Sequence, residues 1–232
     1  MSILFLDIET IPQHPSFDTC TEEVKKLWAR KAANLKHEPE ESVEDLYKRA
    51  GIYAEFGQII CISTGFVHKV NDIETLRIKS FYGHDEQALL SEFGDLLRNR
   101  FSSTDSRLCA HNGKEFDFPF LARRMVINGV PLPGILDTAG KKPWEVNFLD
   151  TMEMWKFGDF KSYTPLNLLT HVLGVPSPKD DIDGSQVWSV YWIEKDLERI
   201  MRYCEKDVEA LANVYRRMKG LKIIPREHVV RA

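Results

Sequence analysis

Short apolar runs separated by polar turns occupy most of the chain, and several have the pattern of strands. Ile3–Leu6 is apolar and ends in acidic residues, which predicts a buried central strand that stops at the edge of a sheet. Gln58–Val67 is rich in β-branched residues and Thr75–Tyr82 alternates, so each predicts a strand. Two further short strands are expected at Arg107–His111 and Val146–Leu149.

Apolar residues at helical spacing follow the later strands. They predict helices over Glu86–Phe101, Asp117–Asn128, Leu166–Leu173 and Lys195–Met218. Gly129 stands where the second of these helices would take its C-terminal cap. The order is three strands, then alternating helix and strand, then helices. This order predicts an α/β fold in which one mixed sheet is flanked by helices.

The segment at about 14–50 interrupts this order and is highly charged. Glu22–Lys36 and Glu40–Ala50 predict two helices in an excursion from the core. Pro176–Trp188 is expected to form a long loop before the final helix. At 232 residues the chain is long for one domain but short for two complete ones, and we expect residues 1–232 to form a single domain.

Composition and charge narrow the class of protein. With 43% hydrophobic residues the 232-residue chain can bury a core, yet no apolar run approaches the roughly 20 residues of a membrane span. The N-terminus lacks the features of a signal peptide, and the four scattered cysteines form no Cys-x-x-Cys pair. We therefore expect a cytoplasmic protein with no membrane contact. The net charge of −4 argues against a protein that holds duplex DNA by its phosphates alone. A metal-dependent enzyme stays possible, because divalent ions supply positive charge.

Four acidic residues stand at the boundaries or on one face of the predicted elements. Asp7 and Glu9 lie two apart in the first strand, so their side chains point to the same face. Asp117 begins a predicted helix, and Asp207 follows Tyr203 by one turn of the last helix. Each has an ordinary explanation alone, as a strand terminus, a helix cap, or a solvated aspartate beside a core tyrosine. Together they would repel one another unless a cation neutralised them, and hard oxygen ligands suit Mg²⁺ or Mn²⁺.

Three segments carry these residues in order: Phe5–Thr10 (FLDIET), Asn112–Phe120 (NGKEFDFPF) and Tyr203–Asp207 (YCEKD). They resemble the three motifs of the DEDD 3′–5′ exonucleases, which share a ribonuclease H-like fold. The second segment is most similar to the proofreading exonuclease of family-B DNA polymerases. Arg202 stands where one branch of the superfamily has histidine, so the chain resembles the tyrosine branch. The resemblance extends from Ile3 to about Met218 and implies a stand-alone exonuclease.

The resemblance also implies a catalytic centre of five residues, which are Asp7, Glu9, Asp117, Tyr203 and Asp207. Asp7 would bridge two Mg²⁺ or Mn²⁺ ions. Glu9 and Asp207 would complete the site of the ion that activates water, and Asp117 would hold the second ion. Tyr203 would orient the attacking water by hydrogen bonding. Two ions about 4 Å apart can clamp a scissile phosphate and stabilise the leaving 3′ oxygen.

Substrate-binding roles implied by the resemblance fall on Thr10, Asn112 and Phe116. Asp150 is a further candidate near the site, although capping of the segment that follows it is at least as good an explanation. The basic residues of the 14–50 excursion fit either a guide for the single strand or a solvated hairpin. Other aromatic residues are expected mostly in the core, with stacking on unpaired bases as the alternative. They are Phe118, Phe120, Trp155, Phe157, Phe160 and Tyr163.

The expected function is removal of nucleotides from the 3′ end of single-stranded nucleic acid, and the resemblance favours DNA. A polymerase or repair partner would act in trans. Two other interpretations stay open: a catalytically silent nucleic-acid or partner-binding module on the same fold, and a related endonuclease or oligonucleotidase. The chain has no Gly-x-Gly-x-x-Gly or P-loop sequence, which argues against a nucleotide enzyme on a Rossmann-like sheet.

Overall fold

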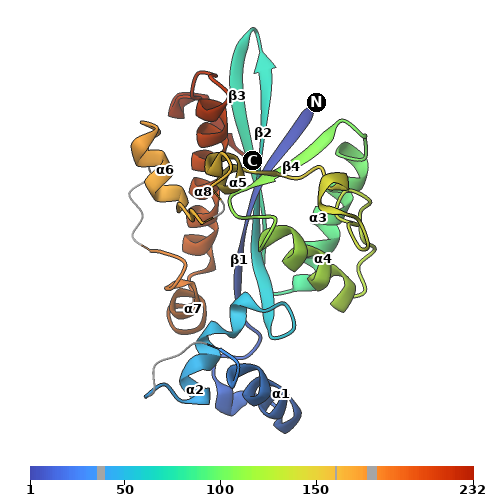
Figure 1. Ribbon diagram of the computed structural model, residues 1–232, viewed down its shortest axis with the longest axis vertical. Helices are drawn as coiled ribbons and strands as arrows, with labels where there is room; N and C mark the ends of the chain where they lie inside the picture. The colour runs from blue at the N-terminus through green and yellow to red at the C-terminus, as the bar shows by residue number, and fades with distance from the viewer. Residues whose placement is uncertain (36–39, 160, 177–181) are drawn as a thin grey trace.

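The computed structural model describes residues 1–35, 40–159, 161–176 and 182–232. In these residues, six strands form one mixed sheet in the order β5-β4-β1-β2-β3-β6, with helices on both sides (Figure 1). The predicted α/β fold is therefore confirmed. The strands are β1 (Ser2–Pro12), β2 (Gly57–Val70), β3 (Ile73–Tyr82), β4 (Ser106–Ala110), β5 (Leu149–Asp150) and β6 (Val229–Arg231).

The central strand β1 separates two hydrophobic clusters. Leu6 and Ile8 point to one face, where they pack with α3 (Glu86–Arg100) and α4 (Asp117–Ile127). Successive side chains of a strand point to opposite faces, so the odd-numbered residues of β1 point the other way. Because the even-numbered side chains of β1 are used by the core on the α3 and α4 side, the odd-numbered ones are available for a site on the opposite face.

The opposite face of β1 is covered by α8 (Leu197–Met218), the longest helix. Phe5 packs there against Tyr215 of α8, with ring centroids 5.4 Å apart in an edge-to-face arrangement. Asp7 and Glu9 follow Phe5 at alternate positions, so the same alternation directs both carboxylates toward α8.

β1 continues past its acidic residues to Pro12, whereas the sequence predicted that Asp7 and Glu9 would stand at the end of the strand. Antiparallel pairing with β2 continues to the end of the strand, with a shift in register after Glu9. Parallel pairing with β4 covers only Ser2–Phe5. The two carboxylates therefore lie inside β1, on the part of the strand that extends beyond the end of β4. The buried Ile8 and Ile11 continue the strand pattern that the acidic residues conceal.

Most other elements agree with their predicted positions to within a few residues. The predicted strand at Val146–Leu149 is shorter in the structure, because β5 pairs with β4 only through Leu149 and Asp150. Gly129 and Gly174 both have positive φ where helices α4 and α6 (Leu166–Val172) end. Several short elements were not predicted from the sequence, among them α5 (Thr151–Lys156), α7 (Val187–Ser189), the π-helix Val190–Glu194 and β6.

The 14–50 excursion forms a small helical cluster at the lower end of the molecule (Figure 1). Helix α1 (Glu22–Ala32) begins at the predicted residue. The second predicted helix is only α2 (Val43–Leu46) followed by a 3₁₀ helix over Tyr47–Ile52. This turn brings Tyr47 against the fully buried Trp28, with ring centroids 5.5 Å apart. The predicted helix end at Lys36 lies outside the described residues, as do Phe160 and residues 177–181 of the predicted loop.

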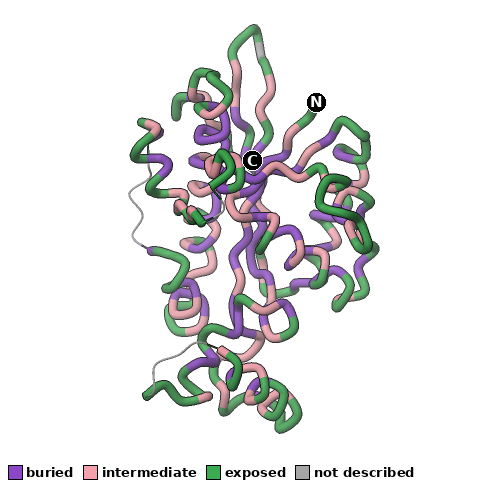
Figure 2. Tube along the Cα trace, in the orientation of Figure 1, coloured by how far each residue is buried: buried purple, intermediate pink, exposed green. Residues whose placement is uncertain are grey.

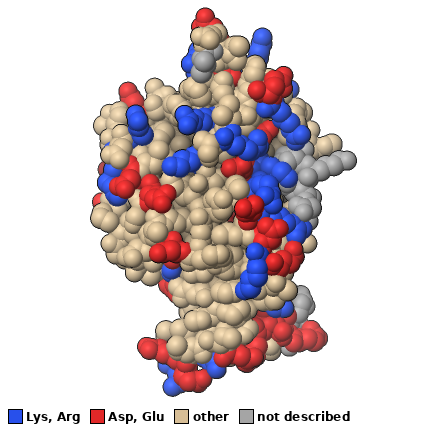
Figure 3. All heavy atoms as spheres, turned by 180° about the vertical axis from the view of Figure 1, so that it is seen from behind, with Lys and Arg blue, Asp and Glu red and all other residues tan. Residues whose placement is uncertain are grey.

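Burial follows the two central strands and the inner faces of the helices, while the outer surface of the excursion is largely exposed (Figure 2). On the face shown in Figure 3, acidic side chains gather on the excursion, whereas basic and acidic side chains are interspersed on the main body. In the described part of the chain, no helix combines the length and the apolar character that crossing a membrane requires.

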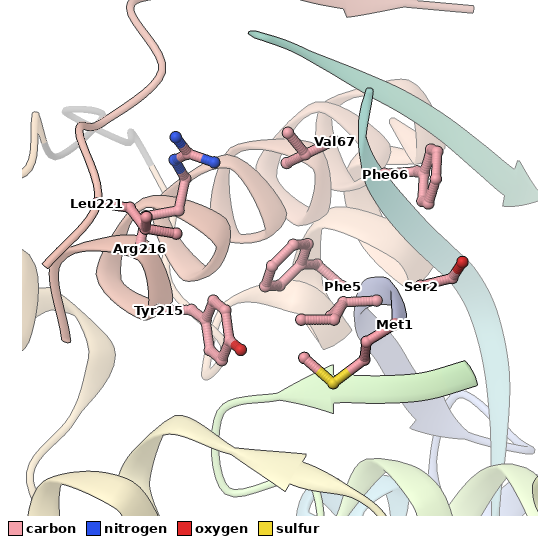
Figure 4. A pocket seen from close by; sticks show the side chains of 9 residues that line it. Met1, Ser2, Phe5, Phe66, Val67, Tyr215, Arg216 and Leu221 are labelled. Atoms are coloured by element: carbon pink, nitrogen blue, oxygen red, sulfur yellow. The ribbon is translucent and has the colours of Figure 1, made fainter. Parts of the chain in front are cut away.

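A pocket of about 180 Å³ lies between the start of β1, β2 and the C-terminal end of α8 (Figure 4). Phe5, Val67 and Tyr215 form part of its apolar wall, and Met1 and Leu221 lie at its lining as well. This pocket contains none of the predicted catalytic residues, because those lie further along β1 and α8.

Candidate active site

Asp7 and Glu9 lie side by side on β1, with Asp7 half-buried and Glu9 buried. Cys204 of α8 packs against them, and its thiol lies 3.4 Å from both the backbone oxygen and the Oδ2 of Asp7. One ligand atom from each of these three residues lies within 4.8 Å of the other two. The prediction that Asp7 and Glu9 share a face is confirmed.

Asp117 and Asp207 approach this pair from two other elements. Asp117 is the first residue of α4 and is only 3% exposed. The N-cap position belongs to Phe116, so Asp117 is not the cap of this helix. Asp207 lies on α8, and its negative charge and that of Asp117 both raise the pKa of Asp7. The structure therefore brings the four predicted carboxylates into one electrostatic cluster.

Burial and mutual repulsion perturb this cluster strongly. Burial raises the pKa of Asp7 and of Glu9 well above the usual range, and the neighbouring carboxylates raise both further. Burial also raises the pKa of Asp117 to about 7, although backbone hydrogen bonds, one of them to Ile8, oppose the rise. A divalent cation would offset this repulsion, and carboxylate oxygens are the ligands that Mg²⁺ and Mn²⁺ prefer. The donor set therefore fits such ions.

Tyr203 lies one turn before Asp207 on α8 and is half-buried. Burial raises the pKa of its hydroxyl, and so do the charge of Asp207 and a hydrogen bond to that carboxylate. Glu9 and Asp7 raise this pKa further. The hydroxyl consequently stays protonated at neutral pH and can donate a hydrogen bond.

Asn112 begins the turn between β4 and α4, and its φ of 60° places it in the left-handed region that asparagine tolerates. Asp150 lies beneath this turn and is 3% exposed. Its carboxylate accepts hydrogen bonds from the backbone N–H groups of Met152 and Glu153, so the predicted capping of the following segment is confirmed. It also accepts from the N–H groups of Asn112 and Lys114.

The remaining predicted substrate residues differ in exposure. Thr10 and Phe116 are half-buried, and the Phe116 ring lies 5.4 Å from that of Phe120. Phe118 and Phe120 are buried in the core, as expected. Two of the aromatic residues are instead strongly exposed, namely Phe157 (87%) and Tyr163 (61%).

Sequence reasoning missed the role of Cys204 as a neighbour of the carboxylates. The residue lies within the third motif between Tyr203 and Asp207, yet its spacing on the last helix is also that of a core residue. Cys61, which faces Glu9 across the β1–β2 pair, is also fully buried. An apolar pattern contains no signal that separates a thiol beneath a carboxylate from one packed among aliphatic side chains.

A family model described as "Predicted 3′-5′ exonuclease related to the exonuclease domain of PolB" matches residues 52–223. This region contains the second and third motifs, and the first lies before it. A search of curated proteins found no match.

Among solved structures, the chain is similar to the family B DNA polymerase from the hyperthermophilic archaeon Pyrobaculum calidifontis, with a TM-score of 0.55 and 17% identity. The similarity covers 91% of this chain and 24% of the polymerase chain, so this chain spans about a quarter of that protein. The RNase domain of the yeast Pop2 protein matches with a TM-score of 0.39 and 13% identity, over 88% of this chain and 75% of that one.

The polymerase similarity agrees with the mixed sheet and flanking helices described above. The family match extends over well more than half of the 232 residues and includes Asn112, Asp117, Tyr203 and Asp207. The chain therefore belongs to the family of predicted 3′–5′ exonucleases related to the exonuclease domain of PolB, and by that membership it is an enzyme of the nuclease class.

Proposed function

We propose that this enzyme is a metal-dependent 3′–5′ exonuclease that hydrolyses phosphodiester bonds at the 3′ end of single-stranded nucleic acid, with DNA as the favoured substrate. The convergence of four carboxylates from β1, α4 and α8 carries the proposal. Burying such a cluster costs folding free energy unless a cation compensates its charge. A site for divalent ions is the function that this arrangement supports best.

Asp7, Glu9, Asp117 and Asp207 are the residues that would hold two Mg²⁺ or Mn²⁺ ions. When bound, such ions supply an activated water and stabilise the charge on the leaving 3′ oxygen. The Tyr203 hydroxyl, which stays protonated, is suited to orient the attacking water by hydrogen bonding.

Recognition of the 3′-terminal nucleotides is proposed for Thr10, Asn112 and Phe116, which border the carboxylates in the sequence. Asn112 and Phe116 belong to the turn that leads into Asp117, and Thr10 directly follows Glu9. Contacts made this close to the carboxylates would place the terminal phosphodiester bond, and not an internal one, at the reaction centre.

Two exposed aromatic residues are proposed to stack on unpaired bases further along the strand. The Tyr163 hydroxyl lies 3.5 Å from Glu115, so this ring borders the turn before Asp117. The Lys156 ammonium group lies 4.5 Å from the centroid of the same ring, which combines a cation with an aromatic face. Phe157 is 87% exposed and has a φ of 43°. An exposed aromatic side chain and a left-handed backbone are both unfavourable for folding. A role in stacking on a base would explain why the chain keeps them at this position.

We also propose that residues 1–232 act as one exonuclease domain. β6 pairs with β3 near the end of the chain, and Arg231 forms an ion pair with Glu205 of α8, so both ends of the described chain belong to one sheet. In the excursion, Lys25 pairs with Glu22 and Lys31 lies over the Tyr53 ring. These contacts favour a self-contained helical hairpin over a guide for the nucleic-acid strand.

Digestion of a 5′-labelled single-stranded DNA oligonucleotide tests the proposal. With Mg²⁺ or Mn²⁺ the expected product is a ladder that shortens from the 3′ end, abolished by EDTA and by Asp7→Ala. Single internal cuts would instead indicate an endonuclease. A wild-type protein that is inert on this substrate, on RNA and on duplex ends would contradict the proposal in favour of a binding module.

A further inference from the structure

Asp150 joins the end of β5 to the start of α5 and accepts four backbone hydrogen bonds while buried. Two come from the helix that it caps, with N···O distances of 2.9 Å from Met152 and 3.2 Å from Glu153. The other two come from a distant part of the chain, at 3.0 Å from both Asn112 and Lys114. A helix cap alone would account for only the first two.

The two carboxylate oxygens of Asp150 accept different numbers of these hydrogen bonds. Oδ1 accepts from Asn112, Met152 and Glu153, while Oδ2 accepts only from Lys114. The turn is tied to the same region a second time through His111, whose Nδ1 lies 2.9 Å from the Thr151 hydroxyl. The β4–α4 turn is therefore anchored on α5 rather than held by its own contacts alone.

The anchored turn leads directly to Asp117. The backbone oxygen of Asn112 accepts from the N–H of Phe116 at 3.1 Å, and that of Gly113 accepts from Phe118 at 2.9 Å. Gly113 is closely packed, since a Cβ there would lie 2.3 Å from the Cβ of Ala110. A turn with so little freedom transmits a displacement at Asn112 or Lys114 to the first residue of α4.

We propose that Asp150 is a positioning residue for the exonuclease reaction, which fixes the 112–114 turn and thereby places Asn112 for the terminal nucleotide and Asp117 for its metal ion. The proposal rests on the proposed function, because these roles of Asn112 and Asp117 belong to it. Asp150 itself need touch neither the substrate nor the ion. Groups that orient metal ligands in this way typically contribute about 10- to 100-fold to metal affinity or activity.

Asp150→Asn separates the capping of α5 from the contact with the 112–114 turn. The amide oxygen can keep the three hydrogen bonds of Oδ1, including both that cap α5. The amide NH₂ then faces the Lys114 N–H, so two donors meet and that contact is lost. Asp150→Ala removes all four hydrogen bonds and the cap with them. Asp85→Asn is a matched control, because Asp85 likewise caps a helix, α3, by accepting a hydrogen bond from the Ala88 N–H.

The experiment compares the three variants by thermal unfolding, by kcat and KM on the single-stranded oligonucleotide, and by Mn²⁺ titration of the whole protein followed by electron paramagnetic resonance. Asp150→Asn is expected to unfold near the wild-type temperature, to lose about 10- to 100-fold in kcat/KM, and to bind its weaker Mn²⁺ ion less tightly by a similar factor. Asp85→Asn should match the wild type in activity and Mn²⁺ binding.

Wild-type activity and Mn²⁺ affinity in Asp150→Asn would overturn the proposal and leave Asp150 as a helix cap. A loss of thermal stability in Asp150→Asn as large as in Asp150→Ala would overturn it as well, since any loss of activity would then follow from misfolding. A failure of the proposed function is distinguishable, because an inert wild-type enzyme contradicts that function while the Mn²⁺ titration still compares the variant with the wild type.

Discussion

Replacing Asp117 with asparagine should stabilise the metal-free protein at neutral and alkaline pH, because it removes a charge that the fold does not compensate by itself. Asp117 is 3% exposed, and its pKa is raised to about 7 from an ordinary value of 3.8, mainly by burial. Asparagine has nearly the same shape and keeps an oxygen that can accept the backbone hydrogen bonds. The substitution therefore tests the charge with little change in packing.

The sign of the effect follows from proton binding. Between pH 3.8 and about 7 the folded protein keeps a proton on Asp117 that the unfolded chain has lost, so stability falls as the pH rises through this window. Above about 7 the whole penalty is present. The difference between the two pKa values corresponds to about 4 kcal/mol. For a chain of this length, such a gain would raise the unfolding temperature of Asp117→Asn by roughly 10 °C at about pH 8.

Thermal unfolding in EDTA, followed by circular dichroism from about pH 5 to about pH 8, measures this difference. The gap between Asp117→Asn and the wild type should widen as the pH rises, while Asp85→Asn should follow the wild type throughout. Adding Mg²⁺ should then stabilise the wild type more than Asp117→Asn. A variant no more stable than the wild type at the alkaline end would refute the reasoning, since the buried charge would then carry no cost.

Two further predictions concern the reaction and the substrate strand. Tyr203→Phe should slow cleavage and leave Mn²⁺ binding largely unchanged, because the role proposed for the hydroxyl is to position water and not to bind a metal ion; a large loss of Mn²⁺ affinity would show a structural role instead. Replacing Phe157 or Tyr163 with alanine should raise KM for a single-stranded oligonucleotide with little effect on kcat. The matched control is Trp144→Ala, since Trp144 is 76% exposed and lies in a different segment; equal changes in all three variants would remove the stacking role.

Periodicity predicted the large elements of the fold because their burial is one-sided. α3 and the first half of α8 each bury one face, and such a face leaves apolar residues at helical spacing, whereas residues 210–216 of α8 are all buried. The short elements were not predicted, because α5, with six residues, and β6, with three, are too short to show a hydrophobic period. The sequence did not predict the continuation of β1 from Glu9 to Pro12 for a different reason, because acidic residues after an apolar run are typical of the end of a strand.

The candidate site, like the fold, was predicted only where local spacing determines which side chains are neighbours. Spacing alone placed Asp7 beside Glu9 and Tyr203 one turn from Asp207. It did not predict that Asp150 would reach the turn at Asn112, because that contact joins residues nearly 40 positions apart in the chain. The preference of aspartate for helix caps gave a sufficient local explanation, and the tertiary role of the same oxygens becomes visible only when α5 lies against the turn.

The folding free energy lost by burying the carboxylates together is itself an argument that the cluster binds a cation. If Asp7, Glu9 and Asp117 served only to hold the fold, amides of the same shape would make similar hydrogen bonds without repulsion. Their burial in one place instead raises the pKa of each, and every raised carboxyl pKa weakens folding as the pH approaches neutrality. A bound cation reverses this balance, because the charges that repel one another all attract it. If a divalent ion restores the stability that the buried charges remove, the carboxylates that weaken folding are the same groups that bind the ion.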